Sequence, residues 1–344
     1  MLLLEIPSEA RGLGSCSEAT GSVGPQDAPA LAALALPVHA NLSVSESLVL
    51  GKQGLELALQ RGDAAELARA ASNLGIAALA SGRDWGWSLV EQGLSAAEAV
   101  ADRRESTRIS INAAIAALWL GEHARALSLF EDLRLVVDAT GCSWLEDRVG
   151  VLGAELSRRT KGEATSQPST VAPFDPSVAS LQGRLALEAG DLDWAELMLL
   201  PVAERGFDEG FPDLAASASA CLAEIAMQEG DLQASISWAG RAVAPARMGA
   251  VAWWGDVLAP AVAALCRHEM VREAAQIVME AEAALREATA PRARAALLQA
   301  NGLLAEADGR PTQARSMYAA ASRRFADLPD LPTARACALA LSRA

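Results

Sequence analysis

Turn signals recur along this chain at nearly constant spacing, and they limit what it can fold into. Each signal ends one apolar helical pattern and opens the next. The gaps between them are 39, 69, 40, 39 and 40 residues, so one gap is nearly double the others. The residues at these positions are Gly82, Gly121, Gly190, Gly230, Glu269 and Gly309. Such a period predicts a repeat protein made of helix pairs, in which each pair packs on its neighbours.

Small residues stand at fixed offsets from these turns. Glycine or alanine lies seven residues before five of the six turns, and alanine lies four residues before five of them. Residues three and four apart share one face of a helix. Larger side chains lie nine residues after four of the turns, at Phe130, Leu199, Val278 and Tyr318. We therefore expect the two helices of each pair to pack closely, with the larger groups filling the space between repeats.

The composition supports an all-α fold. Alanine, the best helix former, supplies 76 of the 344 residues, and aromatic residues make up only 4%. Runs rich in Val, Ile, Thr and Tyr, which would indicate strands, are absent from the sequence.

The doubled gap indicates how the repeats are divided. Residues 1–29 are rich in Gly, Ser and Pro without periodicity, and we expect them to be weakly ordered. Residues 30–160 form the first half of the predicted array, with a helix over 143–160. Three prolines and several Ser and Thr residues then predict a loop over 161–176, in place of the second helix of one repeat. Residues 177–344 form the second half of the array and end in a capping helix.

The repeats resemble the tetratricopeptide repeat. Gly190-Asp191-Leu192 and Gly230-Asp231-Leu232 match the turn of that family, and the small residues match its packing positions. The resemblance implies a right-handed α-α superhelix of about six to seven helix pairs. The period exceeds the 34 residues typical of the family, and most of its first-helix Trp and Tyr residues are missing.

The last repeat resembles those of large ATP-binding LuxR-type regulators, the MalT-like group. The stretch begins Gly309-Arg310-Pro311, passes through Arg324-Phe325 and ends in a short Pro-containing turn before an Ala-Arg-Ala helix. In that group a nucleotide-binding module precedes the repeats and a helix-turn-helix follows them. Neither pattern is visible in this sequence, and the phosphate-loop motif is absent. The resemblance therefore implies the sensor array alone, from a bacterial regulatory system.

Charge and hydropathy exclude several classes of partner. The net charge is −14 and the basic residues are dispersed, which argues against binding nucleic acid or an anionic membrane. No segment is apolar enough to span a bilayer, and the N-terminus lacks the basic start of a signal peptide. The five cysteines are far apart and odd in number, so we expect no disulfide framework. The sequence predicts a cytoplasmic protein.

No motif in the sequence predicts catalysis, a metal ion or a cofactor. The cluster Cys266-Arg267-His268-Glu269 has metal-ligand types, but its position predicts an ordinary helix end. No nucleophile stands with a base and an orienting group. Arg61-Gly62-Asp63 matches an adhesion motif, but it also fits a helix end followed by a cap, which is the interpretation we favour.

A binding groove is expected on the face formed by the first helices of the pairs. Its positions lie thirteen, ten, six and three residues before each turn. Exposed tryptophan is favoured at binding hot spots, and neighbouring residues on a helix diverge by about 100°, so one of two adjacent tryptophans is expected at a groove or an edge. The candidates are Arg69, Arg108, Arg184, Glu224, Asp256, Gln299 and Glu306, with Trp253 and Trp254.

This groove would be basic toward Arg69, Arg108 and Arg184 and acidic toward the other end. The arginines suit an acidic peptide tail or an anionic metabolite, although they also fit a solvated face paired with nearby carboxylates. We expect a non-enzymatic binding module for a partner protein, a peptide or a small inducer. The alternative is an assembly scaffold that forms homo-oligomers through its repeats. An enzyme would require an active site that the sequence does not reveal.

Overall fold

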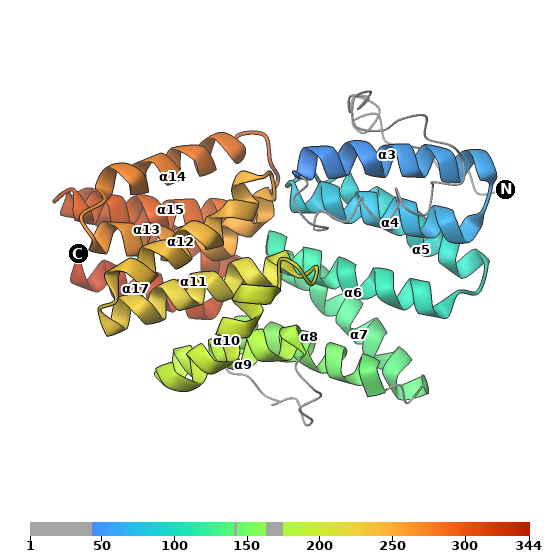
Figure 1. The fold of residues 1–344 in the computed structure, drawn as a ribbon, viewed down its shortest axis with the longest axis horizontal. Helices are drawn as coiled ribbons and strands as arrows, with labels where there is room; N and C mark the ends of the chain where they lie inside the picture. The colour runs from blue at the N-terminus through green and yellow to red at the C-terminus, as the bar shows by residue number, and fades with distance from the viewer. Residues whose placement is uncertain (1–42, 141–142, 163–174) are drawn as a thin grey trace.

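The computed structural model describes residues 43–140, 143–162 and 175–344, and in these ranges the chain is entirely helical, with fifteen α-helices and no strand. The expectation of an all-α protein is confirmed to that extent. Figure 1 shows their arrangement. The helices are α3 Val44–Arg61, α4 Ala64–Ala80, α5 Gly86–Ala99, α6 Arg103–Leu120, α7 His123–Thr140, α8 Ser143–Lys161, α9 Pro176–Ala189, α10 Leu192–Arg205, α11 Pro212–Glu229, α12 Leu232–Arg247, α13 Trp254–Arg267, α14 Val271–Ala284, α15 Pro291–Ala307, α16 Pro311–Asp327 and α17 Leu331–Arg343, and a short 3₁₀ helix, η2, spans Val251–Trp253.

Local capping explains where many helices begin and end. Ser43 and Glu46 form a reciprocal capping box at the start of α3. Gly62 ends α3 in the left-handed conformation, and the Asp63 carboxylate accepts hydrogen bonds from the next two free N–H groups of α4. Arg61-Gly62-Asp63 is therefore a helix end followed by a cap, as expected.

All six predicted turn positions adopt a left-handed backbone. The five glycines have φ between 68° and 85°, and Glu269 has φ 59°. This conformation puts the Cβ of other residues close to the following carbonyl oxygen, which explains why glycine occupies five of the six positions. The spacing of the turns thus correctly located six of the breaks between the described helices.

The two helices on either side of a turn pack closely where the sequence has small residues. A Cβ on Gly183 of α9 would lie 2.5 Å from Leu199 Cγ of α10, and one on Gly302 of α15 would lie 2.6 Å from Tyr318 Cε1 of α16. In both pairs the glycine lies seven residues before the turn and the large side chain nine residues after it. Leu199 and Tyr318 are buried as a result.

Helices that follow one another in the chain make the most extensive contacts, but the array also folds back on itself. In Figure 1, α3–α8 lie beside the group formed by α11–α17. The Val44 N–H donates to the Met248 carbonyl at 2.9 Å, and the Thr289 N–H donates to the Gly82 carbonyl at 2.6 Å. One large apolar core, rich in alanine, runs through both groups.

Trp253 and Trp254 are both buried, with 3% and 1% of their surface exposed, so the expectation that one of them lies at a groove or an edge is wrong. Trp253 ends the 3₁₀ helix η2 and Trp254 begins α13, so the two do not share one regular helix. They also lie where helices of both groups converge, and apolar neighbours surround them. The ring of Trp253 meets that of Trp119 edge to face, with centroids 5.4 Å apart.

Three predicted segments fall partly or wholly outside the described residues. These are the segment 1–29, the beginning of the first half of the array from residue 30 to residue 42, and most of the loop 161–176. The flanking helices of that loop end at Lys161 and begin at Pro176. Across the described ranges, none of the helices has both the length and the hydropathy needed to cross a membrane.

Candidate functional site

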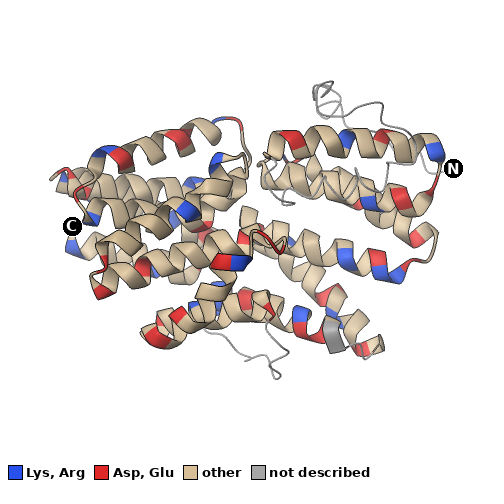
Figure 2. Ribbon diagram, in the orientation of Figure 1, with Lys and Arg blue, Asp and Glu red and all other residues tan. Residues whose placement is uncertain are grey.

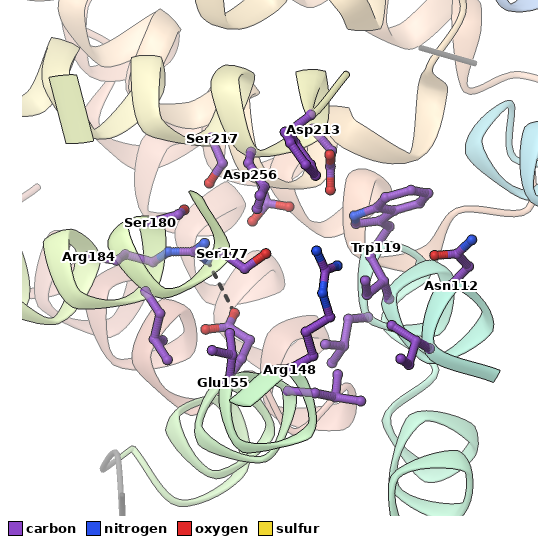
Figure 3. A pocket seen from close by; sticks show the side chains of 18 of the residues that line it. Asn112, Trp119, Arg148, Glu155, Ser177, Ser180, Arg184, Asp213, Ser217 and Asp256 are labelled. Carbon is purple, nitrogen blue, oxygen red and sulfur yellow. Dashed lines mark hydrogen bonds and ion pairs between the residues drawn. The ribbon is translucent and has the colours of Figure 1, made fainter. Parts of the chain in front are cut away.

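A pocket of about 300 Å³ opens where α6, α8, α9 and α11 converge, and Ile76 of α4 and Asp256 of α13 also contribute to its lining. Figure 3 shows its polar side chains pointing inward from several helices. Its size is at the lower end of the range for small-molecule sites. We refer to it as the central pocket.

One wall of the central pocket is apolar. It is formed mainly by side chains of α6 and α8, with Phe211 and Leu214 at the start of α11. The residues from α6 and α8 are Ile111, Ile115, Leu118, Trp119, Val151 and Leu152. Since Trp119 packs on the buried Trp253, this wall has a rigid backing. Such a surface suits the apolar part of a ligand.

Two charged side chains enter the pocket without an ion-pair partner among the described residues. Arg148 extends from α8 and Asp213 from α11, so they approach from different walls (Figure 3). The described contacts contain no hydrogen bond from the Arg148 guanidinium. Burial, and to a smaller extent the charge of Asp256, raise the pKa of the Asp213 carboxyl to about 6, against the opposing effect of the nearby backbone N–H groups of Leu214 and Asp213 and of Arg184.

Two further polar atoms at the pocket lack a hydrogen-bond partner among the described residues. They are the Ser180 hydroxyl and the Nε of Arg184, both on α9 and both buried. A buried polar atom without a partner costs free energy comparable to a lost hydrogen bond. A ligand that bonded to these atoms would remove that cost.

The floor of the pocket is an ion-pair network centred on Glu155 of α8. Its carboxylate accepts hydrogen bonds from Arg158 Nε at 2.8 Å, Arg159 Nε at 2.7 Å and Arg184 Nη1 at 3.2 Å. Arg158 also donates to Glu188 of α9 at 2.6 Å. Burial alone would raise the pKa of Glu155, but the three guanidiniums hold it well below its ordinary value. Glu155 is therefore ionised at neutral pH.

The network continues into the C-terminal helices. Arg159 also donates to the Leu118 carbonyl at 2.9 Å and lies 3.7 Å from the Asp256 carboxylate. Asp256 is 2.8 Å from Arg292 of α15, which in turn donates to Asp330, just before α17, at 2.9 Å. A chain of alternating charges thus links α8 to α13, α15 and the start of α17.

The structure brings together two of the predicted groove residues. Arg184 and Asp256 both line the central pocket and both contact the network. Arg69 is exposed, and Arg108 is held by Glu105, Asn73 and Ser72. Neither of these two arginines lines the pocket.

The remaining predicted groove residues also lie outside the pocket lining. Burial and the nearby charge of Glu188 raise the pKa of Glu224, which is half-buried. Gln299 is half-buried, and Glu306 accepts a hydrogen bond from the Tyr318 hydroxyl at 2.7 Å. Trp253 reaches the pocket only indirectly, through Trp119.

The spacing from the turns that was used to predict the groove also accounts for much of the lining of the central pocket. Positions thirteen, ten, six or three residues before a turn supply about half of its lining. They are Ile76, Ile111, Ile115, Leu118, Ser177, Ser180, Arg184, Ser217 and Asp256. The same count from Gly162, whose φ is 75°, adds Leu152 and Arg159. The face predicted from this spacing therefore overlaps the lining of the central pocket, although only Arg184 and Asp256 of the individual candidates lie in that lining.

Sequence reasoning missed Arg148, Glu155 and Asp213. Arg148 and Glu155 lie on α8, the helix before the doubled gap, and no groove candidates were taken from it. Asp213 lies in the first turn of α11, earlier than the register reaches. Gly162, at the end of α8, is a sequence signal for a turn that extends the register to this helix, and its φ of 75° agrees with that interpretation.

Outside the central pocket, the positive and negative side chains of the described residues are interspersed. In the view of Figure 2, Lys and Arg alternate with Asp and Glu along the ribbon and form no block of one sign. The residues with described side chains contain no group of three or more His, Cys, Asp or Glu arranged to hold a metal ion.

No family model matches the sequence, and no curated protein matches it either.

Proposed function

We propose that this chain is a non-enzymatic binding protein that holds a small molecule in the central pocket. The observation that carries the proposal is the combination of an apolar wall with inward polar groups that have no partner among the described residues. An apolar pocket with a few convergent polar groups is the usual form of a ligand site. The charged groups at its floor neutralise one another in the ion-pair network, which favours a binding role over a catalytic one.

The architecture we propose is a right-handed superhelix of tetratricopeptide type with six to seven helix pairs. The left-handed turns at regular spacing and the close packing of Gly183 on Leu199 and Gly302 on Tyr318 support it. The central pocket then lies on the concave face. This architecture resembles the sensor array of MalT-like regulators, so we place the chain in the cytoplasm of a bacterium as a sensor or adaptor.

The position of the pocket suggests how binding would be transmitted. Its walls come from α6 and α8 of the first half and from α9, α11 and α13 of the second. The network at its floor links the same two halves through Glu155, Arg184 and Asp256. A ligand that contacts both walls would favour the arrangement of the two halves that it binds best. A partner protein bound to the outer surface would respond to that change in arrangement.

Thermal unfolding of the full chain with a library of bacterial metabolites tests the proposal. We expect a subset of compounds to raise the unfolding temperature of the wild type and to lose this effect in Ser217→Trp, which fills the pocket. Ser128→Trp, on the exposed face of α7, is the matched control and should respond like the wild type. If both variants respond alike, the ligand binds elsewhere and the proposal is wrong. A stable large oligomer that no compound affects would favour the assembly scaffold instead.

A further inference from the structure

The charges that line the central pocket are balanced. Three guanidiniums and three carboxylates face it, those of Arg148, Arg159, Arg184, Glu155, Asp213 and Asp256. Taking an uncompensated charge out of water is costly. A ligand with zero net charge therefore enters this pocket at a lower cost than an anion or a cation of similar size.

The balance is not uniform within the pocket. Arg159 and Glu155 are paired in the network, Asp256 is paired with Arg292, and Arg184 uses Nη1 on Glu155. The described contacts leave the guanidinium of Arg148 and the carboxylate of Asp213 available for a ligand. They enter from different walls, α8 and α11 (Figure 3). The free positive and negative groups thus belong to two different walls of the pocket.

Two smaller observations agree with this polarity. The buried Ser180 hydroxyl and Arg184 Nε have no partner among the described residues. Arg184 Nε can only donate, and a hydroxyl can donate or accept, so both can bond to a carboxylate. The apolar wall, which includes Ile115 and Trp119, then faces the body of the ligand.

We propose that the ligand is a small zwitterion with an apolar body, of which a free aliphatic or aromatic α-amino acid is the simplest example. Its carboxylate bonds to Arg148, and its ammonium group bonds to Asp213. Its side chain packs on the wall formed by α6 and α8. This inference rests on the proposed function, because it names the chemistry of the ligand in the same pocket.

Calorimetric titration of the full chain with matched compounds tests it. The probes are L-phenylalanine and L-leucine, with 3-phenylpropanoate and 2-phenylethylamine as the analogues of phenylalanine that lack the amine or the carboxylate. We expect at least one amino acid to bind, and each analogue to bind about tenfold or more weakly than phenylalanine when phenylalanine is that ligand. The corresponding analogues of leucine, 4-methylpentanoate and 3-methylbutylamine, are used when leucine binds better.

Variants assign each end of the ligand. Arg148→Met keeps an unbranched side chain without the guanidinium, and it should weaken binding of the amino acid about tenfold or more while leaving binding of the amine analogue unchanged. Asp213→Asn should weaken binding of the amino acid by a similar factor, and it should not weaken binding of the carboxylate analogue. Arg69→Met and Asp208→Asn, both exposed and outside the pocket lining, are the matched controls and should bind like the wild type. Circular dichroism of each variant checks that it is folded.

Two results would overturn this inference. One is that neither amino acid binds, and the other is that an analogue with a single charged group binds as tightly as its amino acid. If library compounds still lose their effect in Ser217→Trp, the pocket is a ligand site and only the zwitterion assignment fails. If no compound responds to Ser217→Trp, the proposed function fails with it.

Discussion

Gly302 of α15 lies directly against the ring of Tyr318 of α16, so that a Cβ at position 302 would come within 2.6 Å of Tyr318 Cε1. Tyr318 is buried, and its hydroxyl donates to Glu306 at 2.7 Å. The ring is therefore fixed at both ends and has little freedom to move away. This contact is one of the points at which the helices of a pair approach most closely.

We expect Gly302→Ala to destabilise the protein by about 1–3 kcal/mol, because an added methyl group forces the ring or the helix to shift. Gly240→Ala is the matched control. Gly240 lies on the exposed face of α12, and nothing lies within 4 Å of a Cβ there. Since alanine is the better helix former, this change should stabilise the protein by about 0.5–1 kcal/mol. Urea unfolding followed by circular dichroism measures both, and equal effects of the two changes would contradict the packing argument.

Glu269 occupies a turn position where the other five repeats have glycine, and its φ is 59°. A left-handed conformation costs a residue with a Cβ about 1–2 kcal/mol. Glu269→Gly should therefore stabilise the protein by about 1 kcal/mol, less the added entropy of the unfolded chain. The midpoint of urea unfolding should rise at an unchanged slope. A loss of stability would mean that the glutamate makes a compensating contact at this turn.

Glu155→Gln should destabilise the protein by about 3–5 kcal/mol, because it leaves Arg158 and Arg159 buried with a weakened partner. Glu131→Gln, at an exposed position of α7, is the control and should change stability by less than about 0.5 kcal/mol. The free energy of unfolding in urea at pH 7 measures both. A change at Glu155 no larger than that of the control would mean that the network does not stabilise the fold.

The same variant has a predicted dependence on pH. The pKa of Glu155 is lower in the folded protein than in the unfolded chain, where it is about 4.3. Its contribution is therefore complete above that value and is lost as the pH falls through the folded pKa. The difference in unfolding free energy between the wild type and Glu155→Gln should shrink below about pH 4. A difference that stayed constant down to pH 3 would contradict the assignment.

His123 should make the protein less stable in mild acid. Burial lowers its pKa to about 4, as does the charge of Arg159, while a hydrogen bond to the Gly121 carbonyl and the charge of Asp330 act in the opposite direction. The unfolded chain takes up a proton on this ring near pH 6.5, so stability falls as the pH drops from about 6.5 to about 4. The full effect is about 3 kcal/mol.

Comparison with His123→Asn isolates this effect, because the other titrating groups are present in both proteins. Asp213, whose raised pKa makes the protein more stable as the pH falls over the same range, contributes equally in both proteins and drops out of the difference. We expect unfolding free energies measured at pH 7, 6, 5 and 4.5 to fall more steeply for the wild type than for the variant. Parallel curves would show that the imidazole takes up its proton equally in both states.

Much of the secondary structure could be read from the sequence, because local rules determine it. The turn residues and the small residues around them reflect backbone conformation and helix contact, both of which act over a few positions. The positions of Gly121 and Gly302 therefore carried enough information to locate a turn and a helix contact. The register counted from the turns also placed Ile115 and Ser180 on the face that lines the pocket.

The rest depends on contacts between distant parts of the chain. Trp253 and Trp254 were expected to diverge, but the break between η2 and α13 and the convergence of two helix groups bury both. The network around Glu155 joins residues more than a hundred positions apart, and charges on helices look like solvated surface when read one helix at a time. Asp213 entered the pocket only because α11 begins at its edge.

The two backbone hydrogen bonds between the halves, from Val44 to Met248 and from Thr289 to Gly82, bear on how the molecule comes apart. An open array of repeats can fray from either end, since each unit depends only on the next. Here the first helices contact segments two hundred positions later in the sequence, so the N-terminal end of the described chain is held by the C-terminal half. Loss of a single outer helix would expose surface on both halves at once, and the whole assembly should melt in one cooperative step.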